Sequence, residues 1–256
     1  MGQPRTALVT GAASGIGAAI ARRLSEDGVF VFCADRNAEG AERTAAAIRA
    51  AGGDASALAL DVADDSAIEQ EASRLAASHG SLDILVNNAG IGGEVDTATL
   101  TMESVRRVLA INLEGAIAVT LAFRTLLAAS PAGRILNIAS VQGFLGAKNS
   151  LAYGTSKGGL VNLTRDLACD FADEGILVNA LAPGFIDTPM ALLDDGRKEY
   201  DTDWFRDGYV ASGRIPLRRP ASPEEVAEAA LFFCSAANTY VTGQVLAVDG
   251  GLSATF

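Results

Sequence analysis

Short apolar runs alternate along this chain with longer segments whose apolar residues recur at helical spacing. The short runs are apolar on both faces, which is typical of parallel strands that helices cover on each side of a sheet. Strict alternation of strands and helices implies right-handed crossovers, so we predict an α/β fold with a doubly wound parallel sheet. The expected strands are residues 7–10, 29–34, 57–60, 82–86, 134–139, 177–181 and 244–248.

The segments between these strands predict the helices and one long connection. A helix should begin at Pro223, because Ser222 can cap it and Glu225 can complete the capping pattern. No second core and no linker appear, so we expect one dinucleotide-binding and catalytic domain over residues 1–256, with a substrate lid at about 184–221. Two other helices are expected to end near Asp27 and near Ala51. Three more are expected to cover about 64–78, 102–128 and 152–173.

Composition and charge narrow the classes of partner. No apolar run reaches the roughly 18 residues of a membrane span, and no secretory signal precedes the first strand. The net charge of −11 argues against nucleic acid and anionic lipid, which need a basic surface. Three widely spaced cysteines, expected to be buried, and a single histidine indicate a cytoplasmic protein without disulfides and without a metal site.

A glycine-rich turn, Thr10–Gly17, follows the first expected strand with the sequence T-G-A-A-S-G-I-G. Gly11 lets the chain turn, Gly15 removes a side chain that would block a phosphate, and Gly17 lets the next helix pack closely against the sheet. The free N–H groups and the positive dipole end of that helix favour a pyrophosphate. The predicted phosphate-binding residues are therefore Gly11, Ser14, Gly15, Ile16 and Gly17.

A carboxylate ends the second expected strand. Asp35 can accept hydrogen bonds from both hydroxyls of an adenosine ribose, and it would repel a 2′-phosphate. Ser14, in the glycine turn, offers no positive charge to such a phosphate. Both residues favour NAD as the cofactor, whereas Arg36 can pair with a phosphate and keeps NADP as the alternative.

Three side chains in the second half of the chain can perform proton chemistry. Tyr153 and Lys157 stand at positions i and i+4, so they share one face of a helix. A free tyrosine has a pKa of about 10, which a nearby ammonium and a positive nicotinamide ring can lower toward neutral pH. Ser140 follows a strand, at the carboxyl edge where ligands bind in such sheets. We expect its hydroxyl to hold the substrate oxygen while Tyr153 exchanges the proton.

Together these motifs resemble the short-chain dehydrogenase/reductase family, and the match runs nearly end to end. It includes Asn87–Gly90 and the C-terminal Asp249–Gly251. The resemblance implies a Rossmann-type fold, a homodimer or homotetramer, and a catalytic set of Asn112, Ser140, Tyr153 and Lys157.

The same resemblance assigns further roles by position. Asn112 would hold a water that relays protons through Lys157, and Lys157 would also hydrogen-bond the nicotinamide ribose. The other implied cofactor contacts are Asp61 and Val62 at the adenine edge, Asn88, Ala89 and Gly90 on the adenosine ribose side, and Pro183, Gly184, Ile186 and Thr188 toward the nicotinamide carboxamide.

The substrate is less sharply defined. Gln142 can hydrogen-bond a hydroxyl of a sugar or polyol, and the expected lid interleaves apolar and acidic residues. We predict NAD-dependent hydride transfer to or from a secondary alcohol or carbonyl, with a small polar substrate such as a sugar, a polyol or a hydroxy acid. The expected substrate contacts are Ser140, Gln142, Tyr153, Gly184, Met190 and Trp204.

Two other functions stay open. The first is a 3-oxoacyl-[acyl-carrier-protein] reductase that uses NADPH or NADH. An acidic carrier needs a basic docking patch, which this acidic chain lacks at 128–133. The second is an inactive nucleotide-binding sensor, which the complete catalytic set disfavours.

Overall fold

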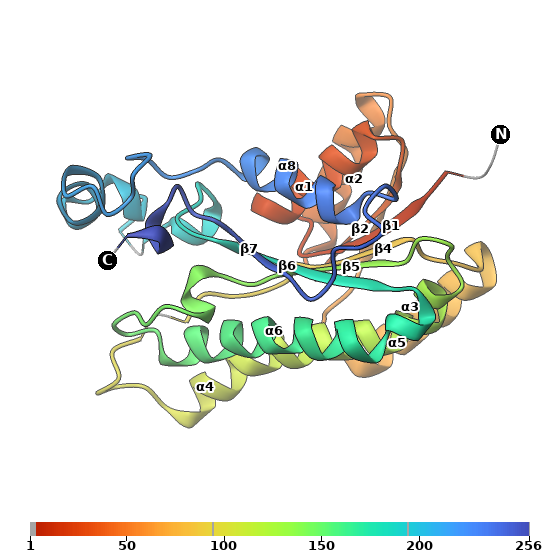
Figure 1. The fold of residues 1–256 in the computed structure, drawn as a ribbon, viewed down its shortest axis with the longest axis horizontal. Coiled ribbons are helices and arrows are strands. Elements are labelled where there is room, and N and C mark those ends of the chain that lie inside the picture. Colours follow the sequence, from red (N-terminus) through yellow and green to blue (C-terminus); the bar gives the residue numbers. More distant parts are fainter. Residues whose placement is uncertain (1–3, 94, 194, 256) are drawn as a thin grey trace.

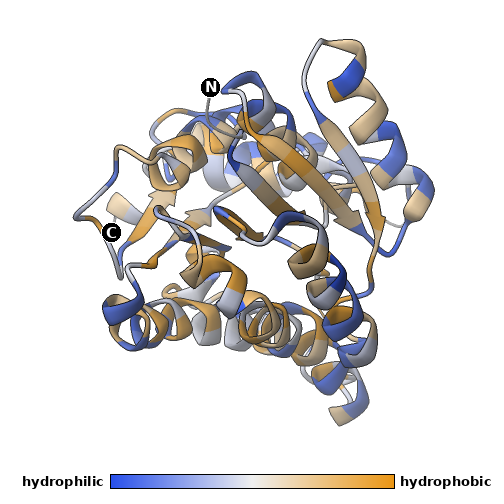
Figure 2. Ribbon diagram, turned by 90° about the vertical axis from the view of Figure 1, so that its right-hand side faces the viewer, coloured by the Kyte–Doolittle hydropathy of each residue, from blue (hydrophilic) through white to orange (hydrophobic). Residues whose placement is uncertain are grey.

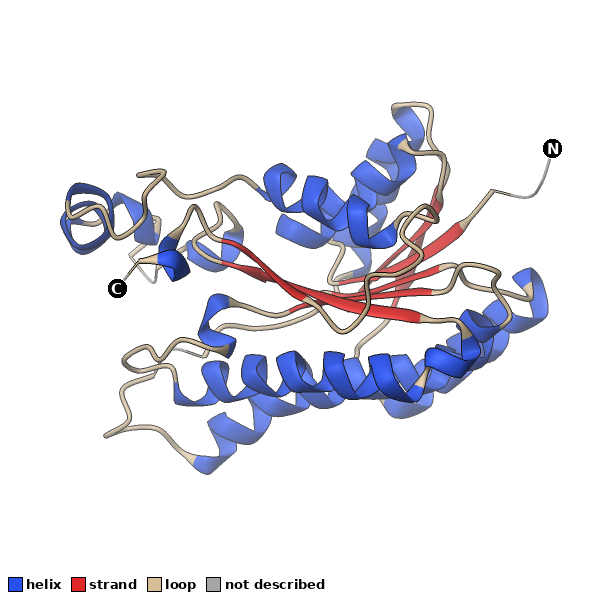
Figure 3. Ribbon diagram, viewed as in Figure 1, coloured by secondary structure: helices blue, strands red, loops and turns tan. Residues whose placement is uncertain are grey.

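The computed structural model describes residues 4–93, 95–193 and 195–255. Within them, seven parallel strands form one sheet in the order β3-β2-β1-β4-β5-β6-β7, with helices on both faces (Figures 1 and 3). This architecture confirms the predicted α/β fold and its doubly wound, Rossmann-type sheet. The strands are β1 (Thr6–Thr10), β2 (Phe30–Asp35), β3 (Ala55–Ala59), β4 (Ile84–Asn87), β5 (Arg134–Ile138), β6 (Leu177–Pro183) and β7 (Val245–Val248).

The helices lie in two layers, one on each face of the sheet. In Figure 1, α1, α2 and α8 cover one face, and α3, α4, α5 and α6 lie on the other. The bounds are α1 (Gly15–Glu26), α2 (Ala38–Ala50), α3 (Asp65–His79), α4 (Met102–Leu109), α5 (Gly115–Ala128), α6 (Leu151–Asp170), α7 (Asp203–Phe205) and α8 (Pro223–Cys234).

Successive residues of each central strand enter opposite cores. In β1, Ala7 and Val9 pack with Ile20 of α1 in one core, whereas Leu8 packs with Phe123 of α5 in the other. All five are buried, with 0 % of their surface exposed. This explains why the strand sequences are apolar throughout, and Figure 2 shows the hydrophobic strands between the two helical layers.

The order of the strands places a crevice next to β1. The chain moves outward from β1 through β2 to β3 and then returns to β4, on the other side of β1. The loops that follow β1 and β4 therefore diverge at the carboxyl edge, where doubly wound sheets bind ligands. Thr10 joins the two strand ends, because its Oγ1 accepts hydrogen bonds from the backbone N–H groups of Asn88 (3.0 Å) and Ala89 (3.1 Å).

The helix expected over 102–128 is divided in the structure. A π-helical turn, Ala110–Glu114, separates α4 from α5. A Cβ on Gly115 would lie 2.7 Å from the backbone oxygen of Val62, so the start of α5 packs directly on the loop after β3. Inserted π turns of this kind are frequent at functional sites.

The segment Met102–Ala128 is also long and apolar enough to cross a membrane, by length and composition alone. We expected from the sequence that no apolar run would reach the length of a membrane span, and this segment departs from that expectation. A core helix passes the same test, and Val119, Phe123 and Leu127 in this segment are fully buried against the sheet. Packing within the fold accounts for these residues, and 33 % of the most apolar window of the segment is buried.

The expectation for the cysteines is confirmed for two and wrong for the third. Cys33 and Cys234 are buried, and burial raises the pKa of each thiol to about 12. Cys169 is exposed, because its neighbours Leu167 and Ala168 occupy the face of α6 that packs on the core.

The long connection before α8, which was expected to form the lid, lies at the carboxyl edge of the sheet. Its base is closed by backbone hydrogen bonds from Asp187 to Ala221 (2.8 Å) and from Ala221 to Phe185 (2.9 Å). Between these points lie short helical turns that the sequence analysis did not predict. They are residues 189–191, 199–201, α7 and the π-helical segment Arg206–Ala211.

Candidate active site

The glycine turn between β1 and α1 has the geometry that its sequence predicts. Gly11 and Gly15 adopt φ values of +67° and +56°, a region that other residues rarely enter. A Cβ on Gly17 would lie 2.3 Å from the backbone oxygen of Gly11. Ser14 precedes α1 and is exposed, and its side chain does not cap the helix. The first N–H groups of α1 lack intrahelical acceptors and suit a pyrophosphate.

Asn88 holds this turn in place. Its Nδ2 donates hydrogen bonds to the backbone oxygens of Thr10 (2.9 Å) and Gly11 (3.2 Å). The resemblance places Asn88 on the adenosine ribose side. In the structure its amide nitrogen holds the glycine turn, and the residue also lines a cavity at the carboxyl edge of the sheet.

A small cavity of about 110 Å³ lies beside the glycine turn. Asp35 enters it from the end of β2, where Oδ2 accepts a hydrogen bond from the N–H of Ala13 (3.0 Å) and Oδ1 accepts one from Asn37 (2.9 Å). Each carboxylate oxygen keeps a further lone pair for a ribose hydroxyl. The cavity brings together six residues predicted to contact the cofactor: Asp35, Arg36, Asp61, Val62, Ala89 and Gly90.

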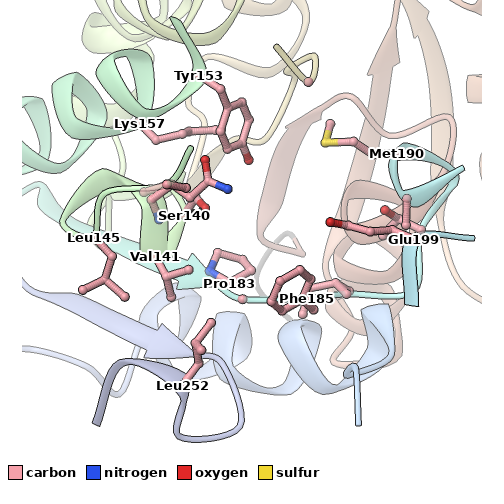
Figure 4. A pocket seen from close by; sticks show the side chains of 18 of the residues that line it. Ser140, Val141, Leu145, Tyr153, Lys157, Pro183, Phe185, Met190, Glu199 and Leu252 are labelled. Carbon is pink, nitrogen blue, oxygen red and sulfur yellow. Dashed lines mark hydrogen bonds between the residues drawn. The ribbon is translucent and has the colours of Figure 1, made fainter. Parts of the chain in front are cut away.

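A larger cavity of about 780 Å³ opens at the carboxyl ends of β4, β5 and β6. Ser140 reaches it from the loop after β5, and Tyr153 and Lys157 reach it from α6 (Figure 4). Pro183 and Gly184 form its wall at the end of β6. The three side chains predicted to perform the proton chemistry thus share one cavity.

Lys157 is fixed beneath this cavity. Only 4 % of its surface is exposed, and its Nζ donates a hydrogen bond to the backbone oxygen of Ile138 (2.8 Å). Burial lowers the pKa of this ammonium to about 8. The Nζ lies 5.6 Å from the centroid of the Tyr153 ring, so a positive charge stands close to the phenol.

Asn112 lies in the π-helical turn and is 1 % exposed. Its Nδ2 donates to the backbone oxygen of Ile91 (3.0 Å) and to Oγ of Ser156 (3.1 Å), while its Oδ1 accepts from the N–H of Ile91 (2.8 Å). A Cβ on Gly90 would lie 3.2 Å from Oδ1 of Asn112 and 3.7 Å from Nζ of Lys157. Asn112 therefore stands behind Gly90, and its side chain positions the loop next to Lys157.

The start of the lid covers the glycine turn. A Cβ on Gly15 would lie 3.2 Å from the methyl group of Thr188, and Ile186 and Thr188 both line the larger cavity. Two further residues expected to contact the substrate, Gln142 and Gly184, line it as well. Met190 also reaches it and is 54 % exposed.

Trp204 does not line the cavity. Its ring packs 4.9 Å from Tyr209 and 6.2 Å from Phe185, between ring centroids, and the residue remains 54 % exposed. Tyr209 takes the place on the cavity wall that the sequence analysis gave to Trp204. The alternation of apolar and acidic residues in the lid does not distinguish Trp204 from Tyr209, because the short helical turns determine which ring faces the cavity.

The cavity also contains residues that the sequence analysis missed. Glu199 comes from the lid and points into the cavity (Figure 4), and Arg214 comes from the end of the lid. Leu252 and Thr255 follow the C-terminal Asp249–Gly251 motif and complete the wall. Nothing in the local pattern marked them, since the tertiary path of the lid and the C-terminus brings them to β5 and α6.

No cluster of three or more His, Cys, Asp or Glu side chains that could hold a metal ion occurs in the described ranges. The two cavities and the glycine turn between them instead fit a dinucleotide. Asp35 would hold its adenosine ribose, the N-terminus of α1 its pyrophosphate, and Lys157 with Thr188 its nicotinamide half. The fold and this site define a nicotinamide-dependent oxidoreductase.

Comparison with known proteins places the chain in a family. The model of a family described as enoyl-(acyl carrier protein) reductase matches residues 11–253. The cis-4-hydroxycyclohexanecarboxylate dehydrogenase of Sinomonas cyclohexanicum is 44 % identical over 98 % of this chain and 97 % of its own length. The chain belongs to the short-chain dehydrogenase/reductase family.

Two further similarities bear on function. The 3-oxoacyl-[acyl-carrier-protein] reductase of Thermotoga maritima is 35 % identical over 97 % of each chain. The crystal structure of a gluconate 5-dehydrogenase from Burkholderia cenocepacia, in complex with NADP and tartrate, superimposes with a TM-score of 0.90 at 35 % identity. It covers 98 % of this chain and 96 % of that one.

Proposed function

We propose that this chain is an NAD-dependent dehydrogenase that oxidises a secondary alcohol of a small polar molecule, such as a sugar, a polyol or a hydroxy acid. The observation that carries the proposal is the convergence of Ser140, Tyr153 and Lys157 on one cavity beside the dinucleotide site. Relatives named for a cyclic hydroxy acid and for gluconate support a substrate of this class.

The chain's own residues divide the work. The Ser140 hydroxyl donates a hydrogen bond to the substrate oxygen, and Tyr153 removes the proton from that oxygen as the alcohol becomes a carbonyl. Lys157, as an ammonium, favours the phenolate form of Tyr153. The bound nicotinamide supplies the acceptor for the hydride that leaves the carbinol carbon. Asn112 keeps the Ile91 loop, and with it Gly90, against Lys157.

The preference for NAD rests on the small cavity at the end of β2. Asp35 lines the cavity that we expect to hold the adenosine ribose, so its carboxylate would repel a 2′-phosphate there. Arg36 lines the same cavity and offers a phosphate partner. The gluconate 5-dehydrogenase structure contains NADP, so NADP is the competing cofactor.

The second candidate function is reduction of a 3-oxoacyl thioester, which the relative from Thermotoga maritima favours. A carrier protein is acidic and would meet a chain with a net charge of −11. Like charges slow association and disfavour docking. We therefore place this function second.

Replacement of Tyr153 by Phe tests the proposal. Loss of the phenolic proton acceptor should lower kcat by about 10²–10⁴, while NADH binding, followed by fluorescence, should change little. The wild-type protein is assayed first on secondary alcohols, hydroxy acids and oxoacyl thioesters with both cofactors. A Phe variant that retains full turnover, or a wild-type protein that acts only on thioesters, would contradict the proposed function.

A further inference from the structure

Arg214 is a cation on the wall of the larger cavity without an acid partner among the residues that the structure describes. The hydrogen bonds of Arg214 are made by its main chain. The backbone N–H donates to Oγ of Ser212 (3.3 Å), and the backbone carbonyl accepts from Oγ1 of Thr255 (3.3 Å). Arg218, also in the lid, donates to the backbone oxygen of Val210 (2.7 Å). The other four basic residues of the lid each have their own carboxylate. Those pairs are Arg197–Asp195, Lys198–Asp187, Arg206–Asp203 and Arg219–Glu225.

The guanidinium of Arg214 has a rigid support. It lies 5.0 Å from the centroid of the Tyr209 ring. That ring packs 4.8 Å from Phe185 and 5.8 Å from Phe205, between centroids. Ile215, the next residue, is 1 % exposed, so the backbone that carries the arginine is anchored in the core. Stacking on an aromatic face orients a guanidinium and leaves its N–H groups available at the edge.

The position of Arg214 within the cavity determines which way round a substrate would bind. Its ring partner Tyr209 packs on Phe185, and its carbonyl contacts Thr255, close in sequence to Leu252. In Figure 4, Phe185 and Leu252 lie across the cavity from Tyr153. A substrate whose carbinol meets Ser140 and Tyr153 therefore extends its far end toward Arg214.

The wall between these two ends is largely apolar. Leu145, Val141, Phe185 and Leu252 line it, as Figure 4 shows. The other charged side chains that line this cavity are Lys157, next to Tyr153, and Glu199, which points inward from the lid (Figure 4). An acid group near Glu199 would be repelled, whereas one at Arg214 would be attracted and can be bound by two parallel N–H groups.

We propose that Arg214 binds the carboxylate of the substrate, so that among small alcohols this enzyme selects hydroxy acids whose acid group lies across a carbon skeleton from the carbinol. The proposal rests on the function proposed above and narrows its substrate class. Arg214 would act as a specificity-determining residue, and the reaction itself would not require it.

The test compares an acid with its neutral analogue. The wild-type protein and Arg214→Gln are assayed on 4-hydroxycyclohexanecarboxylate and on the primary amide of the same compound. For the acid, kcat/KM should fall by about 10- to 100-fold in the variant, mainly through KM. For the amide, it should stay within about twofold, because no charge pairs with Arg214 there.

Two controls separate specific binding from other effects. Arg197→Gln removes the same charge from the outer lid, where Arg197 pairs with Asp195, and it should leave the acid-to-amide ratio unchanged. Arg214→Lys keeps the charge without the two parallel N–H groups, and should recover part of the preference for the acid. Thermal denaturation verifies that each variant is folded.

An equal loss on acid and amide in Arg214→Gln, or no loss on either, would overturn the role of Arg214. So would a wild-type protein that prefers the amide to the acid. In each of these cases the wild-type protein still oxidises a secondary alcohol, so the proposed function survives. Failure of the wild-type protein to oxidise any of the alcohols would instead refute both.

Discussion

Burial lowers the pKa of Lys157 to about 8. The charge state of this amine in turn influences the ionisation of the nearby Tyr153 phenol. The i,i+4 spacing of Tyr153 and Lys157 predicts that both side chains lie on one face of a helix. The structure adds that the amine is buried and bonded to the oxygen of Ile138. Below pH 8 the amine is charged and favours the phenolate, and above pH 8 that support is progressively lost.

The pH dependence of alcohol oxidation should reflect both groups. We expect kcat/KM to rise with pH through ionisation of Tyr153 below the usual pKa of about 10, and to level or fall as Lys157 loses its proton near 8. In Lys157→Met the rising limb should move toward pH 10, because the ammonium is gone. A wild-type profile that rises only near pH 10 would contradict the role of Lys157.

Asp35 gives the second prediction at the scale of single residues. Asp35→Asn removes the charge with little change of shape, so the ratio of NADH to NADPH affinity should fall by about tenfold, which corresponds to the loss of one close like-charge repulsion. Titration of protein fluorescence with each cofactor measures it. Glu39→Gln, at an exposed acid in the first turn of α2, is the matched control. An unchanged ratio, or a wild-type preference for NADPH, would refute the assignment of Asp35.

At the scale of elements, the break between α4 and α5 matters most. The sequence predicted one continuous helix over 102–128, because its apolar pattern continues through the segment. The structure inserts a π-helical turn at Ala110–Glu114. This turn lets Asn112 bond both backbone groups of Ile91 and lets Gly115 meet the loop at Val62. Those contacts are long-range, so helical periodicity could not reveal them.

Loss of the Asn112 side chain should therefore destabilise the protein. In Asn112→Ala the N–H and carbonyl of Ile91 lose their partner, and the free energy of unfolding should drop by about 1–3 kcal/mol. Urea denaturation measures it. Asn162→Ala is the control, since Asn162 is exposed on α6 and bonds only Asp166 among the described residues. Equal effects of the two substitutions would show that the bonds to Ile91 contribute nothing.

At the scale of the whole molecule, two layers of helices fix the sheet, and the lid and C-terminus close the site over its carboxyl edge. Large apolar side chains remain exposed at Met102, Leu121 and Leu151 on the α4–α6 layer, and at Phe232 and Leu246 on α8 and β7. We propose that other copies of the chain cover these faces in a homodimer or homotetramer. Ser140, Tyr153 and Lys157 reach the cavity from one and the same chain.

The sequence by itself determined the alternation of strands and helices, the glycine turn, the carboxylate at the end of β2 and the pairing of Tyr153 with Lys157. Each of these depends on residues close together in the chain, where periodicity, φ angles and i,i+4 spacing are decisive. Only the tertiary structure decided that Asn88 holds the glycine turn, that Tyr209 and not Trp204 lines the larger cavity, and that Arg214 lines the same cavity. Those outcomes depend on how distant segments pack around the lid, and no local pattern records that packing.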